Sequence, residues 1–123
     1  MRKKSNLEKR ILACSDYIIP TECKILNVNE AIKDVAYIDY ESLFKNNNPI
    51  ELEIGCGKGQ FLCETASLHP EINYLGVEIT SNIIITACER AKKENLTNIK
   101  FLNTNACYLP RYIAPDTISK IHL

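Results

Sequence analysis

Three of the four glycines in this 123-residue chain, Gly55, Gly57 and Gly59, lie within five positions of the run ELEIGCGKG. The apolar, β-prone residues before them, 49–54, predict a strand, and the segment from about 59 to 69 has helical spacing. A strand, a glycine-rich turn and a helix in this order let a ligand approach the backbone without meeting side chains. The cluster therefore predicts an α/β fold with a ligand site at the carboxyl end of its first strand.

The rest of the chain continues this alternation. Apolar, β-prone runs predict further strands at 73–79, 98–103 and 117–123, and the spacing over 80–96 predicts a long amphipathic helix. Strands that alternate with helices are typical of βαβ units and a parallel sheet. We therefore expect an α/β fold of about four parallel strands, with the chain ending in the fourth.

Helical periodicity also predicts which side chains face the core. On the helix after the glycines this set is Phe61, Leu62, Thr65, Ala66 and Leu68. On the helix over 80–96 it is Ile83, Ile84, Ala87, Cys88 and Ala91. Both helices are thus expected to cover the sheet.

Residues 1–48 are interpreted as an N-terminal extension with one or two short helices, and residues 49–123 as the domain proper. The extension opens with MRKKSNLEKR, in which five Lys or Arg residues accompany a single glutamate. Such an arm can follow the phosphates of a nucleic acid. A solvated, frayed terminus is the competing interpretation.

The composition excludes several classes of function. Acidic and basic residues number 15 each, so the net charge gives no support for nucleic-acid binding by the chain as a whole. The six cysteines form no CxxC pair and no zinc-ligand cluster with histidine. No run approaches the roughly 20 apolar residues of a membrane span. We expect a cytoplasmic protein with buried, reduced thiols, no metal and no membrane contact.

The glycine pattern is GxGxG and differs from the dinucleotide fingerprint GxGxxG, because Gln60 stands where the third glycine of that fingerprint would be. No Walker sequence is present either, so a pyrophosphate ligand is disfavoured. Glu53 ends the first strand, where a carboxylate suits a ligand ammonium group, and Glu78 ends the second, where it can bind both ribose hydroxyls. A ligand with an amino group, a ribose diol and no phosphate is S-adenosyl-L-methionine. A glycine-rich turn without any ligand is the alternative.

The run PIELEIGCGKGQFLCETASLHPEINYLGVEI, followed by a long helix, NIKFLNTNA and a last apolar strand, resembles the bacterial tRNA (guanine-N7-)-methyltransferases. The resemblance covers about residues 37–123. It implies a Rossmann-like class I methyltransferase fold, a three-layer sandwich, with S-adenosyl-L-methionine as methyl donor and tRNA as substrate. Guanine N7 carries a lone pair and no proton, so methyl transfer to it depends on alignment more than on a strong base.

By this resemblance, six residues would hold the cofactor: Glu53, Gly55, Gly57, Glu78, Asn105 and Ala106. Glu53 would contact its methionine end, the two glycines would line its backbone, Glu78 would bind the ribose, and Asn105 with Ala106 would meet the adenine. Many bacterial members of the family carry Asp where this chain has Asn105, and an ordinary turn asparagine is the alternative there. For His122, in the last expected strand, a solvated pocket is favoured over a position facing substrate.

In the family, the fourth strand leads into an Asp-Pro-Trp segment and a basic stretch that serve the base and the tRNA. This sequence stops at Leu123, so the catalytic Asp that the resemblance implies lies beyond it and no catalytic residue is assigned here. We expect a truncated, cofactor-binding half that is inactive alone, and formation of N7-methylguanosine by the 123-residue chain would contradict this. The alternatives are a non-catalytic nucleoside-binding fragment and a class I methyltransferase acting on protein or a small molecule.

Overall fold

The computed structural model describes residues 2–21, 29 and 33–123, with side chains from residue 6 onward. Its centre is a four-stranded sheet with the strand order β3-β2-β1-β4, in which all pairs of neighbours are parallel. The strands are β1 Ile50–Ile54, β2 Asn73–Val77, β3 Ile99–Leu102 and β4 Lys120–His122. The predicted parallel α/β fold is confirmed, although β2 and β4 are shorter than the sequence pattern predicts.

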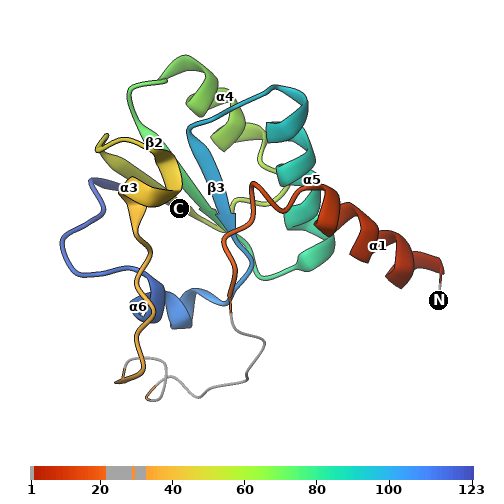
Figure 1. Cartoon of the computed structure of the whole chain (residues 1–123), viewed down its shortest axis with the longest axis horizontal. Helices are drawn as coiled ribbons and strands as arrows, with labels where there is room; N and C mark the ends of the chain where they lie inside the picture. The colour runs from red at the N-terminus through yellow and green to blue at the C-terminus, as the bar shows by residue number, and fades with distance from the viewer. Residues whose placement is uncertain (1, 22–28, 30–32) are drawn as a thin grey trace.

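Helices cover both faces of this sheet (Figure 1). They are α1 Arg2–Ala13, α3 Tyr40–Phe44, α4 Gln60–Leu68, α5 Ser81–Lys93 and α6 Leu109–Tyr112, with a 3₁₀ turn η1 at Ala106–Tyr108. Side chains from α4 and α5 form one hydrophobic core with the sheet, and side chains from α3 and α6 form the other. The expected three-layer sandwich is therefore confirmed.

The predicted inner face of α4 is partly wrong. Phe61 and Leu68 are 49% and 74% exposed, whereas Leu62, Cys63 and Ala66 are buried. Because a helix turns about 100° per residue, the three buried positions share one narrow stripe and the two exposed positions lie on its opposite side. The apolar residue types alone could not predict which side of this short helix faces the core.

The inner face of α5 follows the prediction more closely. Four of the five expected residues are buried, and Ile85 is buried in the place of Ile83, which is half-buried. The helix runs from Ser81 to Lys93, within the predicted range 80–96, and the side chain of Thr80 before it makes no capping hydrogen bond. Asn95, at φ 53°, follows the helix in a left-handed conformation that is common at helix ends.

Part of the segment before residue 49 joins the sheet. The amide of Ile19 donates to the Phe101 carbonyl, and the amide of Phe101 donates to the Tyr17 carbonyl, both at 2.8 Å. Cys14 and Ile19 are buried against the two cores. The described part of the predicted extension contains α1 and α3, and its Cys14, Ile19 and Phe44 pack into the cores, whereas its residues 33–37 are exposed. Residues 1, 22–28 and 30–32 lie outside the described residues.

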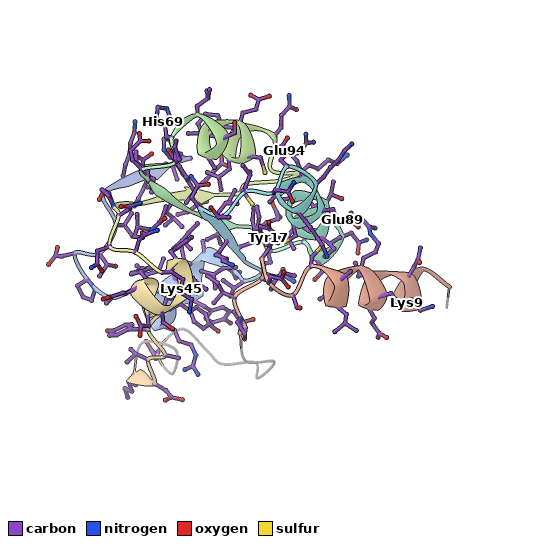
Figure 2. All side chains as sticks on the ribbon, turned by 45° about the horizontal axis from the view of Figure 1, so that its top comes forward. Lys9, Tyr17, Lys45, His69, Glu89 and Glu94 are labelled. Carbon is purple, nitrogen blue, oxygen red and sulfur yellow. The ribbon has the colours of Figure 1, made fainter. Side chains whose placement is uncertain are left out.

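Helix α1 is joined to α5 by a surface ion pair between Arg10 and Glu89, of which Figure 2 labels Glu89. Arg10 Nε and Nη2 donate to the two carboxylate oxygens of Glu89 at 2.9 and 2.5 Å, and this contact lowers the pKa of Glu89. Leu7 and Ile11 pack beside it on the core. One of the basic residues expected to form a free arm is therefore engaged within the protein.

Replacing Arg10 with alanine is expected to have a small effect on stability. Both side chains of the pair are about 40% exposed, and exposed ion pairs contribute little because water and salt screen them. We expect the melting temperature to fall by roughly 2 °C or less at low salt, and by nothing measurable in high salt. Differential scanning fluorimetry at two salt concentrations tests this, and a large, salt-independent loss would contradict it.

Candidate cofactor site

The glycine-rich turn leaves open space over the carboxyl end of β1. Gly55 and Gly57 have φ of 78° and 57°, and a Cβ added to either would meet no atom within 4 Å. Gly59 differs, because a Cβ there would lie 2.7 Å from the Cβ of Ala87 on α5. The first two glycines therefore allow access to the turn, whereas the third allows α4 and α5 to pack closely.

The amide groups of the turn are already bonded within the protein. Gly55 and Cys56 both donate to the carbonyl of Val77, at 2.8 and 2.9 Å, and Gly57 donates to Glu78 Oε1 at 3.2 Å. A phosphate-binding turn needs such donors turned toward its anion. The arrangement supports the sequence argument against a pyrophosphate ligand.

A pocket of about 320 Å³ lies where the loops after β1, β2 and β3 meet. Its lining is Ile54, Gly55, Val77, Glu78, Ile79, Thr104, Asn105 and Ala106. Four of the six residues predicted to hold the cofactor are in this set. Glu53 and Gly57 are not, although Gly57 adjoins the pocket through its bond to Glu78.

Glu78 is fixed at the pocket by two backbone amides. Its Oε1 accepts from the amide of Gly57 and its Oε2 from the amide of Thr80, at 3.2 and 3.0 Å. Each carboxylate oxygen has a second lone pair, so the group can still accept two hydrogen bonds from a ligand. A ribose diol has two hydroxyl groups that can donate these two hydrogen bonds.

Asn103, which the sequence analysis did not single out, supports the loop that carries Glu78. The orientation of its amide that satisfies all its neighbours donates to the carbonyls of Glu78 and Ile79 at 3.1 Å and accepts from the hydroxyl of Ser81 at 2.9 Å. A polar residue at the end of an apolar strand was the available signal. Ile79 was also missed; it is 61% exposed although it is apolar and lines the pocket.

Asn105 has a structural role of its own. Its Oδ1 accepts from the amide of Cys107 at 2.9 Å and caps η1, as the turn interpretation of this residue requires. The side-chain nitrogen makes no hydrogen bond with the described residues. It remains a donor at the pocket lining, so the capping role and a contact with ligand are compatible.

Glu53 is a half-buried acid with one carboxylate oxygen that lacks a partner. Its Oε1 is inaccessible to solvent and forms no hydrogen bond within the described part of the chain. Burial raises the pKa of Glu53, and the nearby imidazole of His122 partly opposes this rise. A buried carboxylate oxygen without a donor is costly, so this oxygen lowers the stability of the folded chain.

His122, for which the sequence favoured a solvated pocket, lies on β4 and is partly buried. Its side chain is 18% exposed, and its Nε2 lies 2.8 Å from Glu51 Oε1. The hydrogen-bonded pair joins β4 to β1. Neither residue was predicted to take part in the site.

The cysteines of the described chain behave largely as predicted. Four of them, Cys14, Cys56, Cys63 and Cys88, are buried, and burial raises the pKa of the Cys63 and Cys88 thiols to about 12. They are protonated packing groups rather than nucleophiles. Cys107 is exposed, contrary to the prediction, and Cys23 lies outside the described residues.

Within residues 2–21, 29 and 33–123, no three His, Cys, Asp or Glu side chains are grouped so as to hold a metal ion. In the same part of the chain, no helix has the length and apolar character needed to cross a bilayer.

Comparison with known proteins identifies the family. Residues 47–123 match the family model described as "Putative methyltransferase". A tRNA (guanine-N(7)-)-methyltransferase of Oceanobacillus iheyensis is 46% identical over 85 residues, which are 69% of this chain and 40% of the relative. One from Geobacillus thermodenitrificans is 33% identical over 123 residues, which are 100% of this chain and 52% of the relative. The chain thus spans about half the length of the curated relatives it matches.

A solved structure supports the fold. The 30S ribosomal A1408 methyltransferase from an uncultured bacterium superposes with a TM-score of 0.52 and 18% identity, over 85% of this chain and 46% of that one. Similarity at this level of identity concerns the fold alone. Together with the match over residues 47–123, it confirms the resemblance inferred from the glycine-rich run. The chain therefore belongs to this methyltransferase family, and its named relatives are tRNA (guanine-N(7)-)-methyltransferases.

Proposed function

We propose that this chain binds S-adenosyl-L-methionine and forms the cofactor-binding part of a cytoplasmic tRNA (guanine-N7-)-methyltransferase. The observation that carries the proposal is the Glu78 carboxylate, held at the pocket by the amides of Gly57 and Thr80 with one acceptor position left on each oxygen. Two acceptors on one carboxylate match the two hydroxyls of a ribose. The names of the relatives supply the tRNA substrate.

The residues present fit the rest of such a ligand. The half-buried carboxylate of Glu53, at the end of β1, has the charge that suits the ammonium group of an amino-acid tail, and the space over Gly55 and Gly57 admits a chain that carries no phosphate. The side-chain nitrogen of Asn105 can donate to an adenine ring nitrogen, and Ile79 offers an apolar surface beside it. When bound, this cofactor supplies a methyl group on a positively charged sulfur.

The part of these residues in the reaction is to bind and orient. Guanine N7 attacks with a lone pair and releases no proton, so alignment of donor and base accounts for most of the rate. Glu78 and Glu53 would fix the two ends of the cofactor and so set the position of its centre. We assign no proton transfer to any residue of this chain.

The first test is binding of S-adenosylhomocysteine, measured by calorimetry on the whole chain. The Glu78→Gln variant keeps the shape of the side chain and replaces one acceptor oxygen with a donor, so we expect roughly tenfold weaker binding. Glu71→Gln is the matched control, because Glu71 is exposed and contacts only His69 among the described side chains; it should bind as wild type does. Absence of both heat and thermal shift with wild type would overturn the proposal.

The second test separates tRNA from other substrates. This chain would replace the matching 123 residues of the Geobacillus thermodenitrificans relative, and the chimera would be assayed with total tRNA, protein extract and labelled cofactor. We expect N7-methylguanosine in tRNA, and loss of most of it in the chimera carrying Glu78→Gln. Methylation confined to protein or small molecules would favour the other methyltransferase classes, and cofactor binding without any methylation would favour a non-catalytic module.

A further inference from the structure

We propose that His122 is a positioning residue for Glu53, and that through Glu53 it controls recognition of the amino-acid tail of the cofactor. The inference rests on the proposed function, since it concerns the end of S-adenosyl-L-methionine that Glu53 would bind. It assigns a role to three side chains, Glu51, Phe61 and His122, that lie outside the pocket around Glu78.

The first observation is the register of the sheet. Glu53 on β1 has Gly76 of β2 as its neighbour on one side and His122 of β4 on the other. Gly76 carries no side chain, and a Cβ there would lie 2.8 Å from the ring of Phe101. On this face of the sheet, the imidazole is therefore the cross-strand side chain that accompanies the Glu53 carboxylate.

The second observation is that the imidazole is held in place. Its Nε2 lies 2.8 Å from Glu51 Oε1, and a carboxylate oxygen can only accept, so Nε2 carries the proton and donates it. The side chains of His122 and Glu51 are 18% and 15% exposed. The ring of Phe61 meets the imidazole edge to face, with centroids 5.4 Å apart. Phe61, on the exposed side of α4, thus packs on the imidazole and not in the core.

The third observation is electrostatic. Burial raises the pKa of Glu53, and His122 is the group whose charge opposes this rise. An ionised Glu53 attracts an ammonium group far better than a protonated one. By lying beside Glu53 and being fixed by Glu51, His122 favours the form of the acid that the ligand requires.

The test compares two ligands that differ only in the tail. S-adenosylhomocysteine has the ammonium and carboxylate groups, whereas 5′-methylthioadenosine has the same nucleoside and sulfur without them. For His122→Asn we expect roughly 3- to 10-fold weaker binding of S-adenosylhomocysteine and less than about 2-fold change for 5′-methylthioadenosine. A merely structural role would weaken both ligands alike, so the ratio of the two affinities is the readout.

The chain offers a matched control in its other histidine. His69, at the end of α4 (Figure 2), also contacts a glutamate, with Nδ1 3.3 Å from Glu71 Oε1, but both side chains of that pair are at least half exposed. His69→Asn should change neither affinity. If His122→Asn folds poorly, His122→Gln is the second variant, because it keeps an N–H donor for Glu51. It should restore the melting temperature and much of the lost affinity for S-adenosylhomocysteine.

The outcomes are distinct. Equal weakening of both ligands by His122→Asn and His122→Gln, or no change with either, would overturn the positioning role while leaving the proposed function intact. If the wild-type chain bound neither ligand, the proposed function itself would fail, and this inference with it.

Discussion

The Gly59→Ala variant is expected to lose roughly 2–5 kcal/mol of folding free energy. Gly59 has φ 78°, a conformation that costs other residues about 1–2 kcal/mol. The new Cβ would also lie 2.7 Å from the Cβ and 3.1 Å from the Cα of Ala87, and overpacking of this kind costs roughly 1–3 kcal/mol. Because domains of this size are stable by only about 5–15 kcal/mol, the loss should be obvious in urea unfolding followed by circular dichroism.

Gly57→Ala is the control that separates the cost of the left-handed backbone conformation from the cost of overpacking. Its φ is also left-handed, at 57°, but an added Cβ meets no atom within 4 Å. We expect it to lose only the conformational part, about 1–2 kcal/mol. Adding Ala87→Gly to the Gly59→Ala chain should recover part of the stability, because one of the two colliding atoms is removed. Equal losses in the two glycine variants would show that packing of α4 on α5 is not what requires Gly59.

The two acidic residues of the site differ in how far the sequence could place them. Glu78 follows β2, which pairs with the strand before it in the chain, β1. Because the carboxyl ends of neighbouring parallel strands lie together, the position of Glu78 beside the glycine turn could be predicted. The network around Glu53 could not be inferred from the local patterns, because it depends on β4 lying beside β1, on the other side from β2. That neighbour follows only from the strand order of the Rossmann-like fold that the family resemblance implies. Sequence patterns identify strands but not which distant strand becomes a neighbour.

The glycine turn shows a similar limit. The pattern correctly predicted a backbone open to ligand, and the structure agrees at Gly55 and Gly57. The pattern gives no information on the amide groups of the turn, and in the structure those of Gly55, Cys56 and Gly57 donate to Val77 and Glu78. The partners of an amide depend on how closely the next strand approaches, which a local motif does not encode. The same dependence on neighbours explains the exposed Phe61, which contacts His122 instead of the core.

The Glu53→Gln variant is expected to be more stable than wild type without ligand and to bind S-adenosylhomocysteine about 10- to 100-fold more weakly. Glu53 Oε1 is buried without a donor, and a neutral amide is cheaper to bury than a carboxylate. We expect a gain of about 1 kcal/mol, or roughly 4 °C in melting temperature. The loss of affinity follows from removal of the charge that would face the ligand ammonium. Glu64→Gln, an exposed acid on α4, is the control and should change neither quantity.

The gain should depend on pH in a defined direction. Burial raises the pKa of Glu53 above its ordinary value of 4.5. At a pH between 4.5 and the raised pKa, Glu53 therefore carries a proton in the folded chain that it has released in the unfolded chain. Wild-type stability contributed by this group is therefore greatest at low pH, falls as the pH rises through the window, and stays low above the raised pKa. Glu53→Gln removes this dependence. The melting temperatures of wild type and variant should therefore be similar near pH 4 and differ at neutral pH. A variant less stable than wild type at neutral pH, with unchanged affinity for S-adenosylhomocysteine, would show that Glu53 is satisfied within the protein and does not serve the cofactor.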